Sequence, residues 1–283
     1  MQFGLSESQK ILKDNARRFF AAECPITEVR RLMASDTAYD PDLWKKMAEQ
    51  GFTGIIFPEE FGGLGLGKVE LALLMEEMGY ALVPGPFFST VVLAGSLLDA
   101  CATTEQKKKY LEPICSGAAR VTVATLMEAG PRPDSDDARI SFANGKLTGR
   151  KLFVPDAAVA DFILVITTYG VLLVESKATG IKIAPMNTLD FTRKLYAVDF
   201  NNTPAEKLAN TTRWTSAFDV ATAALVAEMV GGMQRTLDIT IQYAKTRKQF
   251  GKPIGSFQAV QHKCADMYLE TESSRSAAYY AAW

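Results

Sequence analysis

The chain has 283 residues, of which 48% are hydrophobic and 22% are charged. This length and composition predict one large domain or two to three smaller ones, and they exclude a disulfide-stapled miniprotein, a disordered chain and a collagen-like chain. Thirty-one lysine and arginine residues against 32 aspartate and glutamate residues give a net charge of −1. The chain therefore has no overall positive field for nucleic acid or for an anionic lipid surface.

A single histidine, His262, limits the chemistry that the side chains can perform. One imidazole cannot build a zinc site of two or three histidines, and a serine-histidine-aspartate triad would have to use this residue. The four cysteines form no Cys-x-x-Cys pair, so we interpret them as buried thiols and expect a cytoplasmic protein. We find no signal-peptide pattern and no apolar stretch of roughly 18 residues, and we expect no membrane span.

Helices are predicted in the N-terminal third of the chain. Ser6 and Thr103 each precede a glutamine by three residues, which is a capping-box pattern, and Asp40 precedes a proline that suits a first helical position. Apolar residues follow each of these signals at helical spacing, and a fourth stripe ends at Gly79. The expected helices cover residues 6–20, 40–51, 71–79 and 103–114.

From about Arg120 the apolar residues alternate with polar ones, which indicates strands. Asn144-Gly145 and Tyr169-Gly170 have the composition of tight turns. The spacing of about six short strands favours a small antiparallel barrel or sandwich over an alternating strand–helix sheet. The expected strands cover residues 120–127, 146–154, 161–167, 171–176, 181–184 and 195–200.

The C-terminal part is again helical in pattern. Residues 214–245 contain no proline and are rich in alanine, leucine, valine and methionine, which predicts a long and largely buried helix. A second helix begins near Ser256, and no cap or breaker ends it before Trp283, so we expect the chain to stop inside this element.

These elements predict an α+β protein of several domains. We expect an N-terminal helical domain over residues 1–118, a β-barrel domain over 119–203, and an incomplete C-terminal helical bundle over 204–283.

A glycine-rich segment, Gly62–Lys68, matches the first seven positions of a P-loop. The eighth position is Val69, which lacks the hydroxyl that holds Mg²⁺, and a dinucleotide-binding motif would require glycine where Lys68 stands. A glycine-rich turn before a helix explains the segment better, and a P-loop phosphohydrolase is a distant alternative.

A second segment, Tyr243–His262, joins the two C-terminal helices. Cations cluster where the first helix ends, Phe250 lies in a glycine-bounded loop, and a new helix begins near Ser256. Cations beside a helix N-terminus suit a diphosphate, and an exposed aromatic ring suits a flat ring system. The alternative is a helix end whose cations only complement its dipole.

Two motifs in this chain resemble signatures of the acyl-CoA dehydrogenase family of flavoproteins. The N-terminal motif is Pro58-Glu59-Glu60-Phe61-Gly62-Gly63-Leu64-Gly65, followed by Glu76-Glu77-Met78-Gly79. The C-terminal motif is Arg247-x-Gln249-Phe250-Gly251-x-Pro253-Ile254-x-x-Phe257-Gln258, followed by Ala265-Asp266-Met267. The order of helical, strand and helical regions matches the layout of this family, so the resemblance covers the whole chain.

The resemblance implies an FAD cofactor that lies between the barrel and the C-terminal helices and is contacted by a neighbouring subunit. By motif match, this contact would use Arg247, Phe250, Phe257 and Gln258, with Arg247 opposite the diphosphate. The implied reaction is α,β-dehydrogenation of an acyl-CoA in lipid metabolism. It would involve an electron-transfer flavoprotein-type acceptor and a homo- or hetero-oligomer, either a dimer or a tetramer.

Three departures from the family pattern concern the site itself. Met127 stands where a threonine usually contacts the flavin and substrate, and it cannot donate the same hydrogen bond. The second departure is in the strand that flanks the isoalloxazine. Phe153 aligns with a tryptophan of that strand and can still stack. Pro155, two residues later, has neither hydroxyl nor N–H for the usual contact near N5.

The third departure is the catalytic base, which the sequence does not identify. Most members place it beyond the position of Trp283, and a minority place a glutamate at the position of Ala221, which is followed here by Thr222. Glu228 lies seven residues further along the helix and is a weak candidate. A second hypothesis is therefore a partner subunit without its own base in a heteromeric acyl-CoA dehydrogenase.

Overall fold

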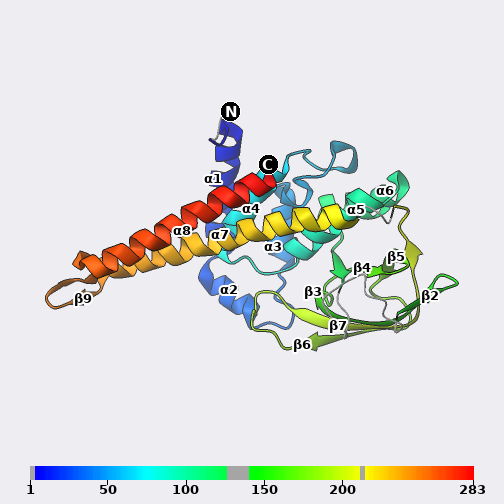
Figure 1. Cartoon of the computed structure of the whole chain (residues 1–283). Coiled ribbons are helices and arrows are strands. Elements are labelled where there is room, and N and C mark those ends of the chain that lie inside the picture. The colour runs from blue at the N-terminus through cyan, green and yellow to red at the C-terminus, as the bar shows by residue number, and fades with distance from the viewer. Residues whose placement is uncertain (1–3, 126–139, 211–213) are drawn as a thin grey trace. The chain divides into compact units, whose positions relative to one another are not determined.

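The computed structural model describes residues 4–125, 140–210 and 214–283 (Figure 1). The chain forms two compact units, each assembled from segments that are far apart in sequence. The helical unit contains Met1–Ile26, Gly67–Val83 and Thr222–Trp283, and the mixed unit contains Thr27–Leu66 and Pro84–Ala221. The three-domain division expected from the sequence stays a prediction.

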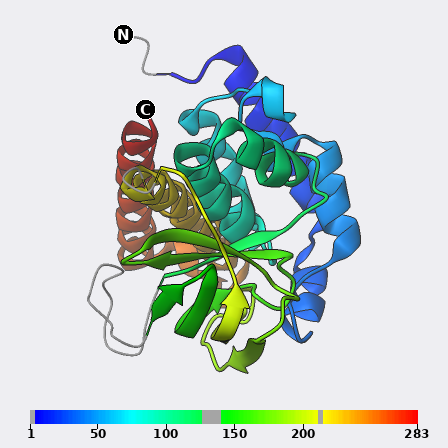
Figure 2. The ribbon, with the colours of Figure 1, turned by 90° about the vertical axis from the view of Figure 1, so that its right-hand side faces the viewer.

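The helical unit is built on four helices: α1 (Glu7–Glu23), α4 (Lys68–Ala81), most of α7 (Trp214–Thr246) and α8 (Gln258–Ala282). The predicted capping box is present at the start of α1, where Ser6 and Gln9 bond each other's backbone N–H. Helices α7 and α8 run side by side, as both ribbon views show (Figure 1, Figure 2).

Helices α4 and α7 approach each other at two glycines. A Cβ atom on Gly79 would lie 1.9 Å from the carbonyl oxygen of Glu228, and one on Gly231 would lie 1.9 Å from that of Glu76. Glycine at both positions lets the two helix backbones touch, which any larger side chain would prevent. The sequence suggested no such contact, because Gly79 was expected only to end its helix.

The mixed unit contains the shorter helices. The predicted helices α3 and α6 are confirmed, with N-caps at Asp40 and Thr103. Helix α2 and the π-helix η3 with its continuation α5 were not predicted. The bounds are α2 (Ile26–Met33), α3 (Pro41–Glu49), η1 (Phe52–Gly54), η2 (Glu59–Phe61), η3 (Phe88–Gly95), α5 (Ser96–Cys101) and α6 (Thr104–Cys115).

The strands of the mixed unit form two four-stranded sheets, in the orders β1-β4-β5-β8 and β2-β3-β7-β6. Both sheets contribute to one apolar core that includes Val154, Ile163, Leu172 and Val198. The bounds are β1 (Val121–Ala124), β2 (Ser141–Ala143), β3 (Lys146–Pro155), β4 (Phe162–Thr167), β5 (Gly170–Glu175), β6 (Ile181–Met186), β7 (Leu195–Pro204) and β8 (Glu206–Lys207).

The sheets confirm the α+β class and correct one detail of it. Strands β1 to β8 form two separate sheets and no closed antiparallel barrel, and β1 pairs with β4 in parallel. A parallel pair needs a crossover of a dozen or more residues, and the intervening residues 125–161 are long enough to provide one. Strand pairing across such a distance is not visible in the local pattern.

The glycine-rich segment forms a turn before α4. The φ angles of Gly62 and Gly65 are 79° and 62°, and a Cβ on Gly63 would lie 2.1 Å from the carbonyl oxygen of Phe57. The glycines are therefore explained by backbone conformation and packing, in agreement with the interpretation of this segment as a structural turn.

By length and composition, α7 is long and apolar enough to cross a membrane, although the sequence predicted no such span. Core helices of soluble proteins pass the same test, so this property is weak evidence for a membrane location.

We predict that Gly231→Ala lowers the free energy of unfolding by about 2 kcal/mol, because its methyl group would overlap the backbone of α4. Gly232→Ala is the matched control, since a Cβ there meets no atom within 4 Å. It should stabilise the chain by up to about 1 kcal/mol through helix propensity. Urea denaturation of both variants measures the difference, and equal stabilities would contradict the close approach of α4 and α7.

Candidate functional site

The segment after α7 forms a short hairpin. Strands β9 (Lys248–Gln249) and β10 (Lys252–Pro253) pair in antiparallel fashion, and the 3₁₀ turn η4 (Ile254–Ser256) leads into α8. Arg247 fixes the base of the hairpin through its backbone, because its N–H donates to Tyr243 and its carbonyl accepts from Ile254, both at 2.8 Å. Phe250 at the tip has a φ of 52°, which a tight turn requires.

The hairpin exposes cations and aromatic rings together. The Phe250 side chain is 90% exposed, and its ring centroid lies 6.0 Å from that of Phe257 in an edge-to-face arrangement. The Lys252 Nζ atom lies 4.5 Å from the Phe257 ring centroid. Arg247 is also exposed, and so is Gln258, the first residue of α8. Four of the predicted cofactor residues are therefore held on one surface feature.

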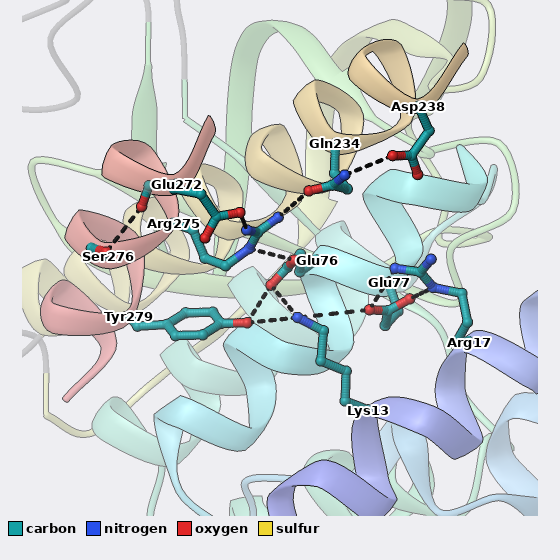
Figure 3. A network of polar contacts seen from close by, with 10 residues as sticks. All are labelled: Lys13, Arg17, Glu76, Glu77, Gln234, Asp238, Glu272, Arg275, Ser276 and Tyr279. Carbon is teal, nitrogen blue, oxygen red and sulfur yellow. Dashed lines mark hydrogen bonds and ion pairs between the residues drawn. The ribbon is translucent and has the colours of Figure 1, made fainter. Parts of the chain in front are cut away.

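A buried carboxylate, Glu76 of α4, connects three helices of the helical unit (Figure 3). Its side chain is 2% exposed and lies 3.0 Å from Lys13 Nζ of α1 and 3.0 Å from Arg275 Nε of α8. The Tyr279 hydroxyl of α8 also donates to it. Burial alone would raise the pKa of Glu76, but Lys13, Tyr279 and Arg275 hold this pKa below its usual value.

The same network reaches α7. The Arg275 guanidinium donates to Gln234 Oε1 at 2.6 Å, and the Gln234 amide donates to Asp238 at 2.8 Å (Figure 3). Glu77, the neighbour of Glu76, is buried and pairs with Arg17. The two helices that flank the hairpin are thus tied to one polar network around the buried Glu76 carboxylate. Sequence reasoning used the two glutamates only as part of a motif; adjacent acidic residues inside an apolar helix were the available signal.

The end of β3 carries the predicted flavin-stacking residue. The pairing register with β7 shifts between Lys151 and Val154, and Phe153 in this irregularity has a φ of 54°. Its side chain is 47% exposed although it lies within a strand. The carbonyl oxygen of Pro155 accepts a hydrogen bond from the Thr122 hydroxyl. This bond holds the backbone of Pro155 in place. Met127 lies outside the described residues.

The positions considered for a catalytic base lie along α7. Ala221 is buried and Thr222 is exposed. Glu228 is half-buried, and its backbone carbonyl packs on Gly79 of α4. Its role as a base stays a prediction.

Comparisons with known proteins agree with this description. Residues 6–118 match the family model described as "Acyl-CoA dehydrogenase, N-terminal domain", and residues 211–283 match "Acyl-CoA dehydrogenase, C-terminal domain". The chain belongs to the acyl-CoA dehydrogenase family. The acyl-CoA dehydrogenase IpdE2 of Mycobacterium tuberculosis is 32% identical over 95% of this chain and 74% of its own length.

Two solved structures share the fold and a detectable sequence similarity. The ChsE4-ChsE5 complex from Mycobacterium tuberculosis has a TM-score of 0.88 and 27% identity, over 100% of this chain and 79% of the matched chain. The FAD complex of PigA has a TM-score of 0.89 and 26% identity, over 100% of this chain and 80% of that chain. The family, its oxidoreductase chemistry and the FAD cofactor implied by the motifs are confirmed at this level.

We predict that Glu76→Gln lowers the free energy of unfolding by about 3 kcal/mol at pH 7, because it leaves two partly buried cations without their buried counter-charge. The pKa of this carboxyl is lowered by folding, so its stabilisation is present above the unfolded pKa and is lost as the pH falls through the folded value. The wild type should therefore lose more stability between pH 7 and pH 4 than the variant.

Glu270→Gln is the control for this experiment, since Glu270 is an exposed carboxylate on α8. Denaturation at both pH values should leave this control like the wild type. A Glu76→Gln variant with wild-type stability would contradict the structural role of the network.

Proposed function

We propose that this chain is an FAD-dependent acyl-CoA dehydrogenase that converts an acyl-CoA thioester into the 2-enoyl-CoA. The main support is the hairpin after α7, which exposes cations and aromatic rings at the positions of the family motif. Family membership supports the reaction class, and the acyl group itself is left open.

The residues present suit a dinucleotide cofactor. Arg247 is exposed at the hairpin base and can pair with a diphosphate through two parallel hydrogen bonds. Phe250 at the exposed tip offers a flat apolar surface to a ring system. Because both side chains point to solvent rather than into their own unit's core, we propose that they hold the FAD of a neighbouring subunit, together with Phe257 and Gln258.

The second contact surface is the end of β3, where the exposed ring of Phe153 would stack on the isoalloxazine. Pro155 offers no donor there, and the contribution of Met127 is a prediction. When bound, FAD supplies the acceptor for the hydride that leaves the β-carbon of the thioester. The protein must supply a base for the α proton, and Glu228 is the candidate within this chain.

An oligomer follows from this proposal, since one subunit would complete the cofactor site of another. A homo- or hetero-oligomer, a dimer or a tetramer, is consistent with it, and an electron-transfer flavoprotein-type acceptor would reoxidise the flavin. We infer a cytoplasmic location, which the four free cysteines support because reduced thiols are typical of that compartment.

A partner subunit without its own base is the second candidate function. It is favoured by Met127, Pro155 and Ala221, since none of these residues supplies the acid–base or donor group expected at its position. The similarity to a chain of the ChsE4-ChsE5 complex also supports it. In this alternative the chain would keep the interface and part of the flavin site, and another chain would provide the base.

We predict that Arg247→Gln weakens FAD binding about tenfold, because a charge-assisted hydrogen bond to the diphosphate is lost. Lys245→Gln is the matched control, as it removes an exposed cation from the last turn of α7. Fluorescence titration with FAD should leave this control unchanged. Equal losses in both variants would show that only overall charge matters at this surface.

Anaerobic mixing with a panel of acyl-CoA esters separates the two functions. A dehydrogenase with an internal base should bleach its bound flavin, and Glu228→Gln should abolish bleaching without loss of FAD. A chain without a base should bind FAD and keep its colour, and Ala221→Glu should then restore bleaching by supplying a carboxylate. A chain that binds no FAD under any condition would contradict both functions.

A further inference from the structure

A buried acidic residue, Asp156, lies immediately after the strand end that carries Phe153. Its side chain is 3% exposed, and its φ is 54°. The backbone is held on both sides, since its N–H donates to Lys194 at 2.9 Å and its carbonyl accepts from Val159 at 3.1 Å. The backbone of this turn is therefore fixed independently of the carboxyl group.

The carboxyl group of Asp156 faces the first turn of the π-helix η3. Its Oδ2 atom lies 2.6 Å from the Ser89 hydroxyl, and that hydroxyl lies 3.1 Å from the carbonyl oxygen of Pro86. Among the described residues, the Oδ1 atom has no hydrogen-bond partner. π-Helical segments are rare and often occur at functional sites, so the contact of Asp156 with η3 is a candidate functional contact.

One hydroxyl proton cannot serve two acceptors fully. When Asp156 is ionised, Ser89 donates to it and the Pro86 carbonyl loses that donor. When Asp156 is protonated on Oδ2, it donates to Ser89 Oγ, and Ser89 then donates to Pro86. Protonation thus completes a chain of two hydrogen bonds from the end of β3 to the loop before η3, whereas ionisation leaves only one of them.

We propose that Asp156 is a positioning residue for the end of β3, and that its carboxyl group and the Ser89 hydroxyl form a proton-dependent clamp between this strand end and η3. The consequence for FAD rests on the proposed function, in which Phe153 stacks on the flavin. In the neutral state the clamp reaches the Pro86 carbonyl through two hydrogen bonds, and in the charged state it consists of the Asp156–Ser89 hydrogen bond alone.

Burial, more than the surrounding charges, places the transition in an accessible pH range. Burial raises the pKa of Asp156 to about 6, while the Ser89 hydrogen bond and Arg193 oppose this shift and Asp190 adds to it. Tyr196 of β7 also faces the carboxyl group, and its own pKa is raised mainly by burial. With a pKa of about 6, the protonated fraction falls about tenfold between pH 5 and pH 7.

The clamp is tested without flavin by NMR titration of the ¹³C-labelled aspartate carboxyl groups, with Asp156→Asn used to assign the signal. We expect a midpoint near pH 6 in the wild type. Ser89→Ala should raise the midpoint because the ionised form loses its donor, and Asp190→Asn should lower it because a repelling charge is removed. A wild-type midpoint near that of a free aspartate, or no effect of Ser89→Ala, would overturn the clamp.

The positioning role is tested by the rate of FAD release at pH 5 and pH 7. The wild type should release FAD more slowly at pH 5, in proportion to the protonated fraction. Asp156→Asn should release it slowly at both values, because its amide can donate to Ser89 permanently. Asp199→Asn, which removes a partly exposed carboxylate from the neighbouring strand β7, should follow the wild type.

Equal pH dependence in the wild type and Asp156→Asn would overturn the positioning role. A chain that binds no FAD at either pH would instead overturn the proposed function, and the NMR titration would still decide whether the clamp exists.

Discussion

The helical unit depends on a buried carboxylate, Glu76, whose charge is balanced by Lys13 and Arg275 and by the hydroxyl of Tyr279. An unpaired charge at such a position would cost several kcal/mol, so α1 and α8 must stay close to α4. The direction of the Glu76 pKa shift agrees with this view, because its partners outweigh the effect of burial. The network also specifies the register of α8, since Glu76 meets side chains from two successive turns of that helix.

This constraint connects packing with the proposed cofactor site. The hairpin between α7 and α8 is short, and its position follows from the two helices that carry it. The glycine contact of α4 with α7 and the charge network of α4 with α8 hold both of them. The hairpin can therefore expose Arg247 and Phe250 to solvent while its base stays fixed. Preorganised side chains of this kind bind a ligand at a lower entropic cost.

Local signals predicted much of the fold. The capping residues Ser6, Asp40 and Thr103 begin their helices as expected, and Asn144-Gly145 forms a turn with φ angles of 52° and 71°. Helix η3 was missed because its residues are almost all buried and show no one-sided pattern. The parallel pairing of β1 with β4 was missed because it depends on tertiary contacts.

The candidate site was predictable where a motif is continuous in sequence, as in the hairpin from Arg247 to Gln258. It was not predictable where the partners are distant. Nothing near Asp156 in the sequence indicates that Ser89 would contact it, and nothing near Glu76 indicates Arg275. Burial and long-range charge pairing decide the chemistry of these carboxylates, and only the folded chain shows them.

The central claim is that one flavin is bound by the hairpin of one subunit and by the β3 end of another subunit. An experimental structure of the assembled protein with FAD tests it most directly. We expect the diphosphate beside Arg247 of one subunit and the isoalloxazine against Phe153 of another. Flavin bound elsewhere, or a diphosphate bound at the glycine-rich turn of residues 62–67, would contradict the account.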